Sequence, residues 1–158
     1  FDQRPIEARS DVLVYTSSPM ENYIEVTGPV TVTLYASSSA RDTDFTAKLL
    51  DVSPDGYARN LTEGIIRARY RTVRAPASLI EPNQVYEYQI DLWSTSNLFR
   101  KGHSIRLEVS SSNFPRFDRN ANTGEAIGTD ASFFPALQTI YHTSEYPSRL
   151  TLPVVPRD

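Results

Sequence analysis

Apolar and polar residues alternate along most of the chain, and this two-residue period constrains the fold more than any other feature of the sequence. The alternation recurs in seven segments and predicts strands with one buried face. Proline and glycine turns separate these segments, and none sustains a helical period. Only 95–99 and 131–137 allow a short helical turn. The expected strands carry their apolar residues at 12–14, 30–36, 45–49, 66–70, 86–92, 105–109 and 150–154.

Seven or eight strands in 158 residues, with connections too long for hairpins throughout, predict an all-β fold. We expect two antiparallel sheets packed face to face as a jelly-roll β-sandwich of the galactose-binding-domain-like kind. Residues 1–158 are expected to form a single domain, and 1–10 read as a polar linker. A domain of this size buries roughly 68–70% of its extended-chain surface, so a sizeable core is available.

The composition argues against several classes of partner. The chain has 19 acidic and 16 basic residues, and a net charge of -3 provides no general attraction for nucleic acid or an anionic membrane. No apolar run approaches the roughly 18 residues of a membrane span. The chain has no cysteine, which excludes disulfides, thiolate nucleophiles and zinc-thiolate sites. The lack of cysteine does not distinguish between cellular compartments, and a soluble, cytoplasmic location is favoured over a secreted one.

No catalytic serine motif is present. An α/β-hydrolase needs its nucleophile on a strand-to-helix elbow of the form Gly-x-Ser-x-Gly, which the chain lacks. Gly102, His103 and Ser104 resemble part of such a motif, but Ser104 leads into an expected strand. We therefore expect no catalytic residue, and the chain alone is not expected to be an enzyme.

The segment 110–124 combines turn formers, side-chain amides, charges and two phenylalanines, and it cannot be regular structure. One interpretation is a loop that presents these residues to a partner. The other is a loop that holds itself together through Asx turns, with its phenylalanines against the core. The candidate interface residues are Asn113, Phe114, Arg116, Phe117, Asp118, Arg119, Asn120, Asn122 and Thr123.

This segment also imitates a calcium loop, because Asp118, Asn120 and Asn122 alternate as the first ligands would. The glycine comes one residue late, and Thr129 stands where a bidentate glutamate should close the site. We therefore expect neither a metal nor a cofactor, and expect the amides and Asp118 to bond backbone groups or a neighbouring domain. Asp42 and Asp44 are interpreted in the same way.

Three arginines share the polar face of one expected strand. Such a stripe suggests an anion-binding ridge, but carboxylates on neighbouring strands favour cross-strand ion pairs instead. The arginines are Arg67, Arg69 and Arg71, and the expected partners are Glu87, Asp91 and Glu108.

Four motifs, at 36–56, 67–71, 112–124 and 142–148, together resemble the C-terminal domain of the Xaa-Pro dipeptidyl-peptidase and cocaine-esterase-like (CocE/NonD) hydrolase family. The resemblance covers nearly the whole chain. It implies a non-catalytic jelly roll in a parent esterase, hydrolase or dipeptidyl-peptidase. It also implies that the partners are the α/β-hydrolase and helical cap domains of the same polypeptide, to which 1–10 would link. A homodimer of the parent enzyme is a further alternative.

In cocaine-esterase-like members, two side chains of this domain help to wall the acyl pocket, and the resemblance places them at Leu34 and Tyr35. Strand alternation directs Leu34 into the sandwich and Tyr35 outward, so both reach a pocket only if a bulge intervenes. The tyrosine hydroxyl would need a hydrogen-bond partner there.

The alternative to a hydrolase domain is an independent carbohydrate-binding β-sandwich, because jelly rolls often bind sugars on exposed aromatic rings. Its candidate platform is Tyr15, Tyr57 and Tyr146.

Overall fold

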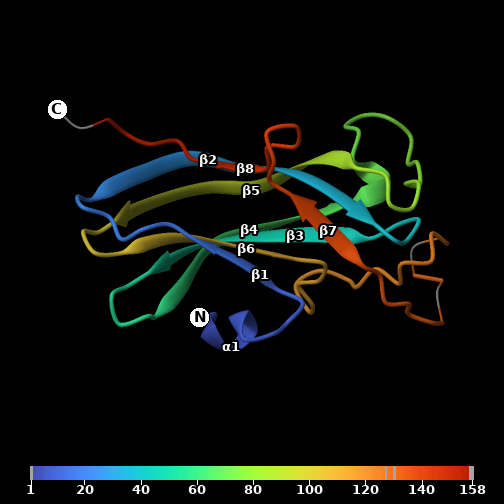
Figure 1. Ribbon diagram of the computed structural model, residues 1–158, viewed down its shortest axis with the longest axis horizontal. Helices are drawn as coiled ribbons and strands as arrows, with labels where there is room; N and C mark the ends of the chain where they lie inside the picture. Colours follow the sequence, from blue (N-terminus) through green and yellow to red (C-terminus); the bar gives the residue numbers. More distant parts are fainter. Residues whose placement is uncertain (1, 127, 130, 157–158) are drawn as a thin grey trace.

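Two antiparallel four-stranded sheets, packed face to face, make up most of the computed structural model, which describes residues 2–126, 128–129 and 131–156 (Figure 1). The expected all-β sandwich is confirmed. One sheet has the order β1-β6-β3-β4, and in the other β2 pairs with β5 on one side and with β7 and β8 on the other. The strands are β1 (Leu13–Thr16), β2 (Ile24–Ser38), β3 (Asp44–Val52), β4 (Ala58–Arg67), β5 (Tyr86–Phe99), β6 (Ser104–Ser110), β7 (Gln138–Tyr141) and β8 (Arg149–Thr151).

The core lies between the sheets and is filled by the inward faces that the alternation predicted. On β2 the buried apolar residues are Val26, Val30, Val32, Leu34 and Ala36. The ring of Tyr88 on β5 lies 4.8 Å, centroid to centroid, from that of Phe45 on β3, so the largest core side chains join the two sheets. Burying each large apolar side chain stabilises the fold by about 1.5–3 kcal/mol.

The sheets approach each other most closely where β4 meets β5. A Cβ atom on Gly64 would lie 2.0 Å from the backbone oxygen of Asp91, so only a glycine fits at this crossing. Next to it, the hydroxyl of Thr62 donates a hydrogen bond to the backbone oxygen of Leu92. On the opposite side the rings of Tyr15 and His142 meet edge to face, with centroids 6.1 Å apart.

Several local predictions are wrong. Residues 95–99 form no helical turn but continue β5, because they pair with β2 from Ile24 to Gly28. Residues 131–137 contain no helix, and β7 was not foreseen. The strand with the arginines ends at Arg67, and a 3-10 turn, η1 (Ala68–Tyr70), follows.

The expected linker 1–10 holds a short helix, α1 (Arg4–Glu7), beneath the sheet that contains β1 (Figure 1). Glu7 accepts a hydrogen bond from Arg106 of β6 at 2.7 Å, and the side chain of Gln3 accepts one from Lys48 of β3 at 2.9 Å. The segment described from Asp2 onward is therefore attached to this sheet.

One end of the sandwich, at the right of Figure 1, collects the long connections. They are the turn 39–43 after β2, the segment 71–85 after η1, and the stretch after β6. We call residues 111–124 the Asn-rich loop. Backbone hydrogen bonds join Ser39 to Leu137 and Ile80 to Arg41, so these connections form one continuous surface.

Candidate functional site

The Asn-rich loop is fixed at its first half by Glu63 of β4. One oxygen of this carboxylate lies 2.7 Å from Nε of Arg116, and the other accepts a hydrogen bond from the Asn113 amide at 2.9 Å. The amide of Asn60 donates to the same second oxygen at 3.3 Å. Because Glu63 is mostly buried, its charge needs these donors, and the loop is held where it supplies them.

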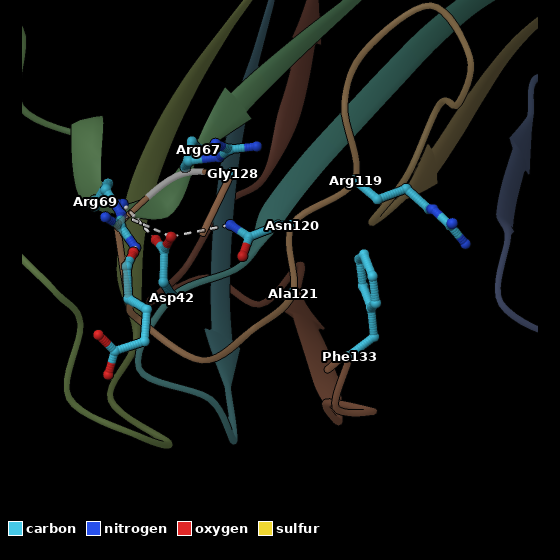
Figure 2. Close-up of a pocket in the computed structure, with 9 residues that line it drawn as sticks. Asp42, Arg67, Arg69, Arg119, Asn120, Ala121, Gly128 and Phe133 are labelled. Atoms are coloured by element: carbon cyan, nitrogen blue, oxygen red, sulfur yellow. Dashed lines mark hydrogen bonds and ion pairs between the residues drawn. The ribbon is translucent and has the colours of Figure 1, made fainter. Parts of the chain in front are cut away.

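Asn120 fixes the second half of the loop. Its Nδ2 atom donates to Oδ2 of Asp42 at 3.0 Å (Figure 2) and to Oδ1 of Asp44 at 2.9 Å. Its Oδ1 atom accepts the backbone N–H of Asn122 at 2.9 Å. The last bond is an Asx turn, as predicted for this segment. Asp42 is 0% exposed, so its carboxylate needs the hydrogen bonds that Asn120 and Arg69 donate to it.

The expected partners of the arginine stripe are wrong, although two of the three arginines do pair with carboxylates. Arg67 binds Asp44 through two nitrogens, at 2.8 and 3.0 Å, and Arg69 binds Asp42 at 2.8 Å. Arg71 donates to backbone oxygens of Ala68 and Ser78. Glu87, Asp91 and Glu108 take no part, because β4 pairs with β3 and Arg67 lies directly opposite Asp44 in that register.

Two small cavities flank Arg67. One, of about 70 Å³, lies among Asp42, Arg69 and Asn120 (Figure 2), and the other, of about 240 Å³, is lined by Phe117 and Asp118. Both are smaller than the roughly 300–1,000 Å³ of an ordinary ligand pocket.

Aromatic rings of this surface remain exposed although the loop backbone is fixed. Phe114 is 62% exposed and Phe133 is 56% exposed, and the guanidinium carbon of Arg119 lies 5.2 Å and 4.9 Å from their ring centroids. Phe134 and Leu137 are exposed beside them. Phe133, Phe134, Leu137 and Glu63 were not among the residues predicted for this surface. The paired phenylalanines at 133–134 were the available signal, since large apolar residues are unusual in an irregular polar segment.

Among the described residues no group of three or more histidine, aspartate or glutamate side chains is placed to hold a metal ion. Asn120 and Asn122 face backbone and carboxylate partners, and Asn122 donates to the backbone oxygen of Phe134 at 2.7 Å. Asp118 is exposed at the edge of the larger cavity.

Leu34 and Tyr35, the residues expected at an acyl pocket, point in opposite directions. Leu34 is 2% exposed inside the sandwich, so its side chain is not available to a neighbouring domain. Tyr35 is half-buried on the outer face, where its hydroxyl donates to Glu87 at 2.6 Å and its ring lies 5.8 Å from that of Tyr146. That hydrogen bond raises the pKa of Tyr35 and lowers that of Glu87. β2 is irregular at Pro29/Thr31 and regular across Leu34 and Tyr35.

A second ionisable cluster lies under α1. Glu108 of β6 is buried, and one of its oxygens and one oxygen of Glu7 accept no hydrogen bond from the described residues. Burial, with a smaller contribution from Glu7, raises the pKa of Glu108 to about 7, although the charges of Lys48 and Arg106 act in the opposite direction. The two carboxyls therefore share a site in which one of them is readily protonated.

His103 lies at the turn before β6, and its Nδ1 atom is 2.7 Å from the carboxylate of Asp51 of β3. Asp51 also accepts a hydrogen bond from Arg59, so the histidine joins a structural link between neighbouring strands. Two tyrosines of the candidate sugar platform pack on other rings: Tyr15 packs on His142, and Tyr146 packs on Tyr35.

No helix in the described part of the chain is long and apolar enough to cross a membrane.

Comparison with known families gives a match over almost the entire chain. A family model described as the X-Pro dipeptidyl-peptidase C-terminal non-catalytic domain matches residues 1–151. The chain is also 49% identical over 158 residues to cocaine esterase from Rhodococcus sp. (strain MB1 Bresler), an alignment that covers 99% of this chain and 28% of that protein.

Two solved structures are similar in both fold and sequence. An aminopeptidase from the marine sediment archaeon Thaumarchaeota archaeon has a TM-score of 0.92 and 35% identity over 98% of this chain and 27% of its own. An α-amino acid ester hydrolase has a TM-score of 0.91 and 32% identity over the same shares. The chain thus spans little more than a quarter of each of these proteins.

Proposed function

This chain belongs to the family of X-Pro dipeptidyl-peptidase C-terminal non-catalytic domains, and we propose that it packs on the catalytic part of a serine hydrolase and helps to shape its substrate site. The expectation of a non-catalytic domain of this family is confirmed by the family match. The parent's reaction, its substrates and the contact surface are the proposed part.

The Asn-rich loop carries this proposal. Its backbone is tied down by Glu63, Asp42 and Asp44, while Phe114 and Arg119 remain exposed. A loop that served only to hold itself together would place its phenylalanines on the core. A rigid loop with exposed aromatic and arginine side chains is typical of the central part of an interface.

A domain packed at this end would act on catalysis indirectly. Inter-domain contacts of 600–1,500 Å² are usual, and they exclude water from what they cover. In a drier active site, the hydrogen-bond donors that stabilise a developing oxyanion interact more strongly with it. We therefore expect the domain to influence both the stability and the turnover of its parent.

For the parent, we propose cleavage of esters or amides of acyl or aminoacyl groups. This class includes the activities in the names of the similar proteins, an esterase, an aminopeptidase and an α-amino acid ester hydrolase. Within the proposed pocket wall we retain only Tyr35, through its ring, since Leu34 is enclosed by the sandwich. A homodimer of the parent remains a further proposal.

The test is to express the parent polypeptide with and without residues 1–158. Turnover of a p-nitrophenyl ester and of an Xaa-Pro anilide is measured together with the melting temperature. We expect the truncated protein to lose most of its activity and to melt earlier. Undiminished activity and an unchanged melting temperature would contradict the proposal.

A further inference from the structure

Arg119 is a cation at this end of the sandwich for which the described residues provide no carboxylate partner. Arg67 and Arg69 bind buried aspartates, and Arg116 binds Glu63. Within the described ranges the contacts found for the Arg119 guanidinium are the faces of Phe114 and Phe133. Figure 2 shows it directed away from the cluster around Asp42.

The two rings fix the direction of this cation. Phe114 belongs to the Asn-rich loop and Phe133 to the stretch before β7, so the guanidinium is held between two separate segments. Ring faces attract a guanidinium but take none of its in-plane hydrogen bonds. The N–H groups of Arg119 are thus held in place and remain available to an acceptor, and a carboxylate matches their fork geometry.

The apolar side chains around Arg119 indicate what kind of surface should carry that acceptor. Phe114 and Phe133 are more than half exposed, and Phe134 and Leu137 lie exposed on the same stretch of chain as Phe133. Exposed apolar side chains gathered around one charged group are typical of a protein contact site. A carboxylate set in an apolar surface would cover the rings and neutralise the charge in one contact.

We propose that Arg119 is the anchor of the interface with the catalytic part of the same polypeptide, and that it binds an aspartate or glutamate set in an apolar surface there. The inference rests on the proposed function and adds the partner's chemistry to it. Most of the length of the similar cocaine esterase lies outside the matched region, and a corresponding part of this polypeptide would supply the partner surface. A second copy docked with Arg119 on the two-fold axis would instead bring two Arg119 cations together, which is unfavourable.

Zero-length cross-linking of the full polypeptide tests this. Arg119→Lys keeps the positive charge and supplies an amine, and a carbodiimide joins an amine to a carboxylate only when the two are in contact. Arg100→Lys is the matched control, because Arg100 is exposed at the end of β5, away from the loop. Mass spectrometry identifies the partner, and a mixture of ¹⁵N-labelled and unlabelled protein separates links within a chain from links between copies.

We expect the lysine at position 119 to be joined to an aspartate or glutamate of the catalytic part within one chain. Its cross-link yield should be about tenfold above that at position 100, which is the ratio expected if the contact favours the bound arrangement by a factor of ten. A yield at position 119 no greater than the control overturns the proposal, and so do links that form only between copies. If cross-linking fails but deletion of residues 1–158 still lowers activity, the proposed function stands and only the role of Arg119 falls.

Discussion

The carboxylate of Glu63 lies 2.7 Å from Nε of Arg116 and ties the Asn-rich loop to β4. Arg116 is largely exposed, and exposed ion pairs stabilise proteins by at most about 1 kcal/mol. The importance of Glu63 comes instead from its burial and from its additional bond to Asn113. Loss of this carboxylate should therefore disturb the loop more than the whole fold.

Replacing Glu63 by alanine is expected to destabilise the protein by about 1–2 kcal/mol, because the amides of Asn60 and Asn113 lose their acceptor. Hydrogen exchange should become faster in residues 111–124 and stay unchanged in β2 and β5. Glu21→Ala, at an exposed position outside the loop, is the control. Uniformly faster exchange across the domain would show that Glu63 supports the fold and not the loop in particular.

Replacing Asn120 by aspartate should be more damaging than replacing it by alanine. Alanine removes two hydrogen bonds to carboxylates that keep their arginines, a loss of about 1.5–3 kcal/mol. Aspartate adds a third negative charge against Asp42 and Asp44, and at least ~1 kcal/mol more is expected from like-charge repulsion. Urea unfolding of both variants at neutral pH measures the difference. Equal stabilities would mean that solvent reaches this cluster.

The protein should lose stability as the pH rises towards neutrality because of Glu108. Its pKa in the folded state is about 7, above the ordinary 4.5, so the folded state binds more protons than the unfolded state between these values. This contribution is fully present below pH 4.5 and is lost as the pH rises through 7. The pKa shift corresponds to a decrease in the free energy of unfolding on the order of 3 kcal/mol.

The variant Glu108→Gln should flatten this part of the pH profile, since glutamine stays neutral opposite Glu7, Lys48 and Arg106. Urea unfolding from pH 4 to 8 gives both curves. A profile that keeps its slope in the variant would assign the effect to another group.

Alanine at Gly64 should destabilise the fold by about 3 kcal/mol or more, because its Cβ would meet the backbone of β5 and neither strand is free to move. Gly56→Ala is the comparison. A Cβ there finds open space, and the change is expected to be near 1 kcal/mol, from the positive φ alone. Similar melting temperatures for the two variants would show that β4 and β5 separate easily.

The sandwich could be predicted from the sequence because strand alternation is a local pattern. The partners of Arg67 and Arg69 could not, since they depend on which strands are neighbours. β4 lies beside β3, which places Arg67 opposite Asp44. The carboxylates of β5 and β6 are not opposite Arg67, because β5 belongs to the other sheet and β6 lies on the far side of β3. The helical turn at 95–99 was wrong for a related reason: pairing with β2 outweighed a weak local capping signal.

The candidate site was predicted only in part. The composition of 111–124 identified the loop and the self-bonding of its amides, and Asn120 and Asn122 confirm that bonding. Phe133 was missed because its role arises from a ring contact with Arg119 across two segments. The short β7 was missed because its four residues contain too few alternations to form a pattern.

All three carboxylates that hold the Asn-rich loop precede it in the chain, at 42, 44 and 63. During synthesis, Asp42, Asp44 and Glu63 therefore leave the ribosome before the asparagines that bind them. When the loop is synthesised, the strands that carry these carboxylates have already been translated. We expect the loop and its exposed aromatic side chains to become ordered late, once those strands are available to bind it.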